Sequence, residues 1–150
     1  MPDEASRDES VAGVVIDTDV YSALYTDPER ASRRGMAVEQ WREVLQGTQV
    51  LISFQTRAEV MAGMQIGNWG ESRKVAAMAK LDSAPTIPAD IDVIRSYADL
   101  TAACRLIGHA LQAKIHSADR WVAASALAKG LPLLSGDRVY RDTPGLRLLG

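Results

Sequence analysis

The chain has 150 residues, of which 47% are hydrophobic and 24% are charged, so it can form one domain with a buried core. Its formal net charge is −2, which excludes a global positive field that would attract a polyanion. Any contact with nucleic acid must therefore come from local groups of arginine or from bound cations. The single cysteine, Cys104, excludes an internal disulfide and fits a reducing cytoplasm.

The first twelve residues, MPDEASRDESVA, contain four acids and one arginine and no apolar stretch. This composition is typical of a flexible lead-in and not of a signal or transit peptide. No apolar run approaches the roughly 18 residues that a membrane span requires, so we expect no contact with a membrane. No repeat or linker divides the rest of the chain, and residues 13–150 are expected to form a single domain.

The first half of the chain alternates short apolar runs with helical patterns. Val14–Ile16 is entirely apolar, which is typical of a strand that is buried on both faces. A short helix is expected over residues 20–25. One long helix is expected over residues 29–46, because its apolar residues recur every three or four positions and Gly47 follows as a terminator. Val50–Ser53 is expected as the second strand.

The second half continues this alternation. Helices are expected over residues 54–68, 71–81, 89–106 and 118–129, and Ser117 is expected to cap the last of them. Strands are expected at residues 131–134 and 146–149, with at most a short one at 85–88. Strands that alternate with helices predict an α/β fold, in which a parallel sheet of four to five strands lies between two layers of helices.

Acidic residues follow several of the predicted strands. Asp17 and Asp19 follow the first, Glu59 lies on the helix after the second, Asp119 lies in the first turn of the helix at Ser117, and Asp137 follows residues 131–134. Ligands of such sheets bind at the carboxyl ends of the strands, so we expect these carboxylates to share one crevice. Grouped carboxylates repel one another unless a cation neutralises them. An oxygen-only ligand set favours Mg²⁺, with Mn²⁺ as the alternative ion.

Each acid also has a purely structural interpretation. Asp17 or Asp19 fits a helix cap, Glu59 a solvated helix surface, Asp119 the positive end of a helix dipole, and Asp137 a Gly-Asp turn. The metal site is preferred because all the acids fall at equivalent ends of the predicted sheet.

Two other functions are compatible with the same acids. An apolar strand followed by Asp-x-Asp also begins phosphatases of the haloacid-dehalogenase type. However, Val20 and Tyr21 stand here in place of Gly-Thr, and no lysine is clearly placed to support a phosphoaspartate. The second alternative is a non-catalytic interaction domain in which the acids hold a metal ion for structural reasons alone.

Four segments together resemble a PIN domain, specifically that of the VapC ribonuclease toxins of toxin–antitoxin pairs: VVIDTDV, SFQTRAEV, HSADRWVAASALAKGLPLLSGDRVY and PGLRLL. The resemblance spans about residues 13–150. It implies a PIN-like α/β/α sandwich and a Mg²⁺-dependent endoribonuclease. It also implies a homodimer that a VapB-like antitoxin neutralises.

The resemblance assigns the catalytic acids to Asp17, Glu59, Asp119 and Asp137. In this assignment Asp17 and Asp119 hold the main Mg²⁺, Asp137 adjusts it or holds a second ion, and Glu59 orients or deprotonates the attacking water. Relatives often have Ser or Asn in place of Asp19, and Phe in place of Tyr140, which we interpret as a packing residue. Arg30, Arg33, Arg34, Arg120, Arg138 and Arg141 are candidates for RNA contact, and a solvated surface is the alternative interpretation for all of them. His116 is expected only to shape the start of its helix.

Overall fold

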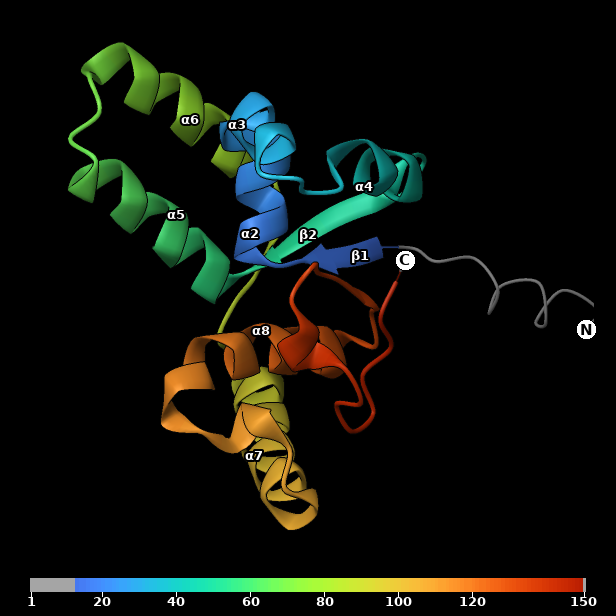
Figure 1. The fold of residues 1–150 in the computed structure, drawn as a ribbon. Coiled ribbons are helices and arrows are strands. Elements are labelled where there is room, and N and C mark those ends of the chain that lie inside the picture. The colour runs from blue at the N-terminus through green and yellow to red at the C-terminus, as the bar shows by residue number, and fades with distance from the viewer. Residues whose placement is uncertain (1–12, 150) are drawn as a thin grey trace, which may run out of the picture.

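The computed structural model describes residues 13–149, and the predicted lead-in at residues 1–12 lies outside this range. Within the described range, four parallel strands form one sheet in the order β3–β2–β1–β4 (Figure 1). Their bounds are Gly13–Ile16 (β1), Gln49–Ser53 (β2), Thr86–Ile87 (β3) and Leu133–Leu134 (β4). The predicted parallel sheet is confirmed. The expected final strand at 146–149 is reduced to one bridge between Leu148 and Leu133.

Helices cover both faces of this sheet (Figure 1). The first group comprises α2 (Thr18–Tyr21) with the π-helical turn Ser22–Thr26, α3 (Pro28–Arg33), α4 (Val38–Leu45), α5 (Phe54–Ile66) and α6 (Glu71–Ser83). The second comprises α7 (Ile91–Ile107), α8 (Ser117–Lys129) and the 3₁₀ turns Ala110–Gln112, Lys114–His116 and Arg138–Tyr140. The predicted three-layer sandwich is therefore confirmed.

Strand β1 is apolar along its whole length because it faces two hydrophobic cores. Val14 and Ile16 belong to the core that includes residues of α2, α4 and α5, whereas Val15 belongs to the core formed with α7 and α8. Successive side chains of a strand point to opposite faces of the sheet, so both faces of β1 require apolar residues. All four residues of the strand are buried. The central strand therefore ends, at Asp17, in the interior of the protein.

The prediction of one helix over residues 29–46 is wrong, because the segment contains two helices. Gly35 has φ +78° and ends α3 in a left-handed conformation. The amide of Met36 donates to the carbonyl of Ala31, and that of Gly35 donates to the carbonyl of Ser32. This pair of bonds is a Schellman motif, which terminates a helix. The connection turns the chain before α4 and places Met36 near the carboxyl end of the sheet.

The start of α8 also differs from the prediction. Ser117 has φ −62° and ψ −38° and is the first residue of the helix. His116 occupies the cap position, and no side chain accepts a capping hydrogen bond there. Gly108 and Gly130 follow α7 and α8 in the left-handed conformation and end both helices. None of the described helices is both long enough and apolar enough to span a lipid bilayer.

Candidate functional site

Asp17 lies at the carboxyl end of the central strand and is almost completely buried, with 4% of its surface exposed. One carboxylate oxygen accepts the amide of Val20 at 2.9 Å and so caps α2. The other accepts the hydroxyl of Ser135, which follows β4. The structural interpretation of Asp17 as a helix cap is therefore confirmed. The same contacts fix its carboxylate between the ends of β1 and β4.

Burial raises the pKa of Asp17 from 3.8 to about 6. Removal of the carboxylate from water is the main cause, and the hydrogen bonds from Ser135 and Val20 compensate only in part. The negative charges of Asp19 and Asp137 raise the pKa further. Ionised Asp17 is therefore destabilised in the metal-free protein, and a bound cation would relieve this cost.

Asp19, on α2, connects the remaining acids electrostatically. Partial burial is the main cause of its raised pKa, and the negative charges of Asp137, Asp119 and Glu59 raise the pKa further. The hydroxyl of Thr18 donates to the hydroxyl oxygen of Thr56 at 3.0 Å, which ties α2 to the helix that carries Glu59. The structure thus brings acids from four separate segments of the chain into one electrostatic group.

Asp119, in the first turn of α8, has a hydrogen-bond donor at each carboxylate oxygen. The hydroxyl of Tyr140 donates to Oδ1 at 3.3 Å. Nδ1 of His116 lies 3.0 Å from Oδ2, and it carries the shared proton because a carboxylate can only accept. His116 therefore contacts an acid of the site and does more than shape the start of the helix. The two donors hold the orientation of the Asp119 carboxylate.

Tyr140 is a polar member of the site, which the sequence did not reveal. Its side chain is buried, and burial together with the charges of Asp119, Asp17 and Asp137 raises the pKa of its phenol far above the usual range. The phenol therefore stays protonated and remains a donor at all physiological pH values. Its hydrogen bond to Asp119 therefore makes Tyr140 part of the acidic group.

Glu59 and Asp137 complete the acidic group from opposite sides. The carboxylate of Glu59 accepts the side-chain amide of Gln55 at 2.9 Å, one turn earlier on α5. Asp137 is exposed, and its carboxylate accepts the amide of Val139 at 2.9 Å, as expected for a turn residue. Its own amide donates to the hydroxyl oxygen of Ser135 at 3.0 Å, so the Asp137 loop is tied to the residue that binds Asp17.

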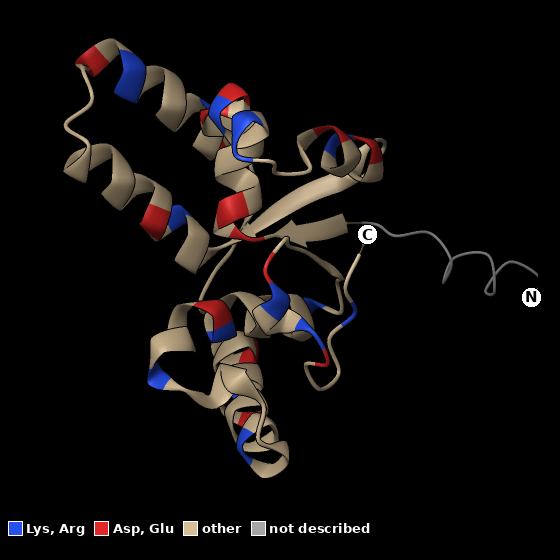
Figure 2. Ribbon diagram, viewed as in Figure 1, with Lys and Arg blue, Asp and Glu red and all other residues tan. Residues whose placement is uncertain are grey.

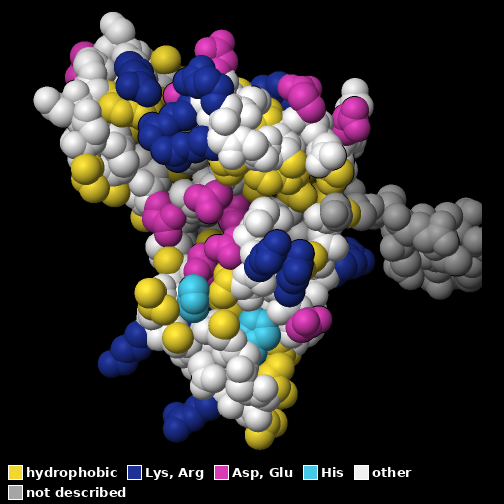
Figure 3. Space-filling model, viewed as in Figure 1, with side chains coloured by type: hydrophobic (Ala, Val, Ile, Leu, Met, Phe, Trp, Pro, Cys, Tyr) yellow, Lys and Arg dark blue, Asp and Glu magenta, His cyan; other side chains and the backbone are white. Residues whose placement is uncertain are grey.

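The acidic group fits a hard divalent cation. Figure 2 shows acidic residues on both sides of the sheet edge where β1 ends, and Figure 3 shows acidic side chains gathered in a central recess. Between residues 13 and 149, no three carboxylate, imidazole or thiolate groups form a preassembled ligand cluster. Mg²⁺ does not need one, because it binds one or two carboxylates directly and reaches the others through water.

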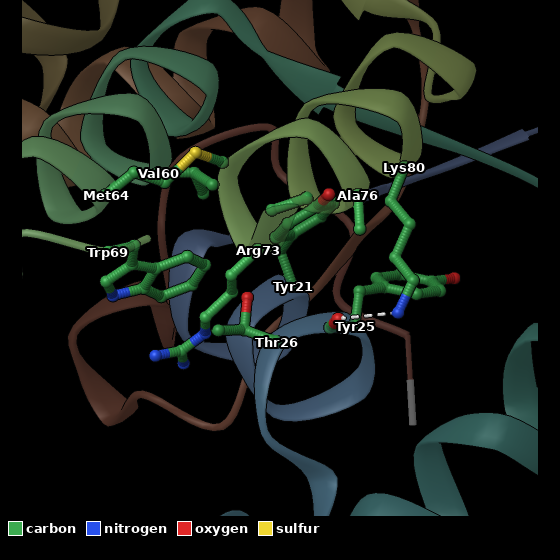
Figure 4. A pocket seen from close by; sticks show the side chains of 10 residues that line it. Tyr21, Tyr25, Thr26, Val60, Met64, Trp69, Arg73, Ala76 and Lys80 are labelled. Carbon is green, nitrogen blue, oxygen red and sulfur yellow. Dashed lines mark hydrogen bonds between the residues drawn. The ribbon is translucent and has the colours of Figure 1, made fainter. Parts of the chain in front are cut away.

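A second hollow lies between the α5–α6 hairpin and the segment from α2 to Thr26 (Figure 4). It has a volume of about 110 Å³. The guanidinium of Arg73 lies 3.5 Å from the ring centroid of Trp69, and the ammonium of Lys80 donates to the carbonyl of Tyr25 at 3.5 Å. None of the residues that line this hollow is acidic, so it is chemically distinct from the acidic group. We refer to it as the α5–α6 cavity.

Residues 14–146 match the PIN domain, so the chain belongs to the PIN-domain family. Among curated proteins it is similar to VapC ribonuclease Y4jK of Sinorhizobium fredii, with 28% identity over 143 residues that cover 91% of this chain and 95% of the relative. The family match leaves the phosphatase alternative without support.

Several solved structures share the fold, and a toxin–antitoxin complex from Klebsiella pneumoniae is among them. VapBC2 from Rickettsia felis, bound to a DNA fragment from its promoter, superposes with a TM-score of 0.71 at 17% identity, over 91% of this chain and 96% of that one. FitAcB from Neisseria gonorrhoeae superposes with a TM-score of 0.68 at 22% identity, with the same coverage of both chains. The expected PIN-like architecture is confirmed.

Proposed function

We propose that the chain is a Mg²⁺-dependent endoribonuclease and the toxin of a toxin–antitoxin pair. The observation that carries this proposal is the convergence of acids from distant segments around buried Asp17 at the carboxyl ends of β1 and β4. The PIN family and the similarity to a VapC ribonuclease support nuclease chemistry. The raised pKa values of Asp17 and Asp19 support a cationic cofactor at this position, because such a cofactor favours the ionised carboxylates.

In this proposal Asp17 and Asp119 hold the main Mg²⁺, with Mn²⁺ as an alternative, and Asp137 contacts it through water or holds a second ion. When bound, the ion supplies positive charge that activates water and stabilises the phosphate in the transition state. Ser135 fixes the orientation of Asp17, while His116 and Tyr140 fix that of Asp119. Hydrogen bonds of this kind orient metal ligands in many sites.

Glu59 is proposed to orient the attacking water and to accept its proton. It approaches the acidic group from α5, and its contact with Gln55 leaves the second carboxylate oxygen without a hydrogen-bond partner among the described residues. Attack of water on phosphorus would break the bond to the 3′ oxygen, which takes up a proton, and would leave a 5′-phosphate and a 3′-hydroxyl. Glu59 thus acts as a general base, for which a position within reach of the attacking water is required.

Purified protein is expected to cleave single-stranded RNA with Mg²⁺ or Mn²⁺ and to lose this activity in EDTA. It is expected to leave p-nitrophenyl phosphate intact, because a phosphomonoester is the substrate of the phosphatase alternative. The measurement is gel analysis of end-labelled RNA, with the released ends identified by chemistry. Absence of RNA cleavage at any divalent-ion concentration would favour the non-catalytic interaction domain.

The proposed partner is a VapB-like antitoxin, and the proposed assembly state is a homodimer. Solved structures with the same fold include members of toxin–antitoxin systems, which supports this partner. We assign the antitoxin contact to the α5–α6 cavity, because its aromatic walls and the cations Arg73 and Lys80 suit an apolar side chain flanked by acids.

Ala76→Trp would fill the α5–α6 cavity, since Ala76 is exposed on its wall. We expect the variant to cleave RNA at the wild-type rate and to lose at least about 1.4 kcal/mol, or tenfold, of affinity for its cognate antitoxin. Titration calorimetry measures the affinity. Ala79→Trp, on the same helix but outside the cavity, is the control. Equal affinity of both variants and the wild type would exclude this contact site.

A further inference from the structure

A groove leads away from the acidic group between α4 and the loop after β4. One wall is the connection Gly35–Ala37 with Trp41 of α4, and the other is the loop Gly136–Arg138. Asp19 and Asp137 lie along the same cavity, which has a volume of about 680 Å³. This size is within the range of about 300–1,000 Å³ that ligand-binding clefts have.

The floor of this groove is apolar. Met36 and Ala37 are partly buried, and Trp41 packs in the core below them. Gly136 lies close to the indole, since a Cβ at this position would be 3.0 Å from Cζ2 of Trp41. The absence of a side chain therefore keeps the loop backbone against the ring and leaves the groove open above it. An apolar floor beside a polar reaction centre suits the flat face of a base.

The groove continues along α3. Asp19 and Met36 also line a neighbouring cavity of about 240 Å³, whose other residues include Arg30 and Arg34. The two cavities therefore adjoin at these shared residues, with Arg138 in one and Arg30 and Arg34 in the other. Figure 3 shows dark-blue cationic side chains on both sides of the central acidic recess. We call the combined feature, from Arg138 through Met36 to Arg30, the α3–α4 groove.

The cations of this groove are available to a ligand. Arg30, Arg34 and Arg138 are all exposed, and none of them forms a salt bridge with a carboxylate in the described part of the chain. Arg33 differs, although it is their neighbour in sequence. It lines a further cavity with Glu29, Glu39 and Arg42, which meets the cavity of Arg30 and Arg34 at Thr26 and Asp27 but includes neither Asp19 nor Asp137. The structure thus divides the arginines that the sequence grouped together.

We propose that the α3–α4 groove binds single-stranded RNA on either side of the cleaved bond, which rests on the proposed function of the acidic group. Arg30, Arg34 and Arg138 contact phosphates, and an unstacked base lies against Met36 and the edge of Trp41. The chain has no net positive charge, so these local cations supply the attraction. A base reaches the apolar floor only when it leaves its stack, which single-stranded RNA permits.

The test is the affinity of a fluorescein-labelled single-stranded RNA, measured by anisotropy over a series of salt concentrations. All variants carry Asp17→Asn so that bound RNA stays intact. Arg34→Gln and Arg138→Gln are each expected to weaken binding about three- to tenfold and to lower the slope of log affinity against log salt by about 0.7. Arg33→Gln is the matched control and is expected to change neither quantity. Met36→Glu, which places a negative charge on the floor, is expected to weaken binding at least about tenfold.

Equal effects of Arg33→Gln and Arg34→Gln would overturn the proposal, because binding would then be spread over the surface. Unchanged affinity in all arginine variants would overturn it too. The same assay is repeated with polyglutamate in place of RNA. If this peptide binds in an arginine-dependent way and RNA does not bind, the ligand of the groove is an acidic protein partner and not RNA. If the wild type cleaves RNA but the variants bind normally, only the groove is rejected. If arginine-dependent binding occurs without cleavage by the wild type, only the nuclease assignment is rejected.

Discussion

Asp17→Asn is expected to abolish metal-dependent RNA cleavage while it preserves the fold. Asn caps helices about as well as Asp, so the bond from the amide of Val20 can remain. The variant loses the buried negative charge that is proposed to bind Mg²⁺. Metal ions contribute several kcal/mol to such reactions, so the rate should fall at least about 100-fold. Gel assays with end-labelled RNA measure the rate, and circular dichroism verifies the fold.

The same substitution should stabilise the metal-free protein at neutral pH. The pKa of Asp17 is 3.8 in the reference state and about 6 in the folded state. Between these values the folded protein binds more protons than the unfolded chain, so the free energy of unfolding falls as the pH rises from about 4 to about 6. The lost stability amounts to at most about 3 kcal/mol. Urea denaturation in EDTA should show a steeper decline in the wild type than in Asp17→Asn, in which Asp19 alone of the two keeps a raised pKa.

Asp90→Asn is the matched control, since Asp90 caps α7 through the amide of Val93 as Asp17 caps α2. It lies outside the acidic group, and its pKa is lowered mainly by a hydrogen bond from Lys129, so its effect on stability has the opposite sign. Cleavage by Asp90→Asn should equal that of the wild type. Addition of Mg²⁺ at pH 7 should raise the stability of the wild type and of Asp90→Asn, but not that of Asp17→Asn. Full activity of Asp17→Asn would remove this residue from the metal site.

Arg120→Ala is expected to destabilise the protein by about 3 kcal/mol, because it leaves the buried carbonyl of Leu111 and the hydroxyl of Tyr97 without the donors that Arg120 supplies. Arg120 is buried, although the sequence placed it among the RNA contacts, and that prediction is wrong. Its guanidinium donates to the carbonyls of Leu111 and Ala113, the latter at 3.2 Å. It also donates to the hydroxyl of Tyr97 at 2.6 Å. A single side chain thus joins α8 to α7 and to the turn before His116.

The expected loss corresponds to a fall in the melting temperature of about 6–12 °C. Arg105→Ala is the control, because Arg105 is exposed on α7 and its removal should change stability by less than about 0.5 kcal/mol. Thermal and urea denaturation measure both variants. Arg120→Lys should recover only part of the stability, since an ammonium group lacks the planar fork that reaches three acceptors. A melting temperature for Arg120→Ala equal to that of the wild type would contradict this structural role.

The strand order could be anticipated only in part. The apolar run Val14–Ile16 identified the central strand, because a strand that is buried on both faces cannot alternate polar and apolar residues. The prediction of one helix over residues 29–46 was wrong because the apolar stripe continues through the break between α3 and α4. Nothing in the sequence around Gly35 distinguishes a glycine that ends a helix from one that a helix tolerates. The pairing of residues 146–149 depends on the path of the chain after Tyr140, which local pattern does not encode.

The acids of the candidate site were recognisable from their positions after strands, but their environments were not. Asp17 and Asp19 are two residues apart, yet Asp17 is almost completely buried, whereas Asp19 keeps much of its surface exposed to solvent. The hydroxyls of Ser135 and Tyr140 bond to Asp17 and Asp119 across 118 and 21 residues of sequence. Such contacts appear only once the strand ends meet, because nothing in the spacing of a serine or tyrosine indicates a donor role.

The order of apolar runs, helix periods and acids along the chain was enough to establish a parallel α/β fold and an acidic edge, since periodicity and burial are local properties of the chain. The three-dimensional arrangement was needed to determine which carboxylate is buried away from water and which donors orient each acid. It was also needed to determine which arginines share a groove with Asp19. These features depend on distances between residues far apart in sequence. The pKa of a carboxyl group responds to every charge and dipole around it, so its chemistry emerges only when the elements pack together.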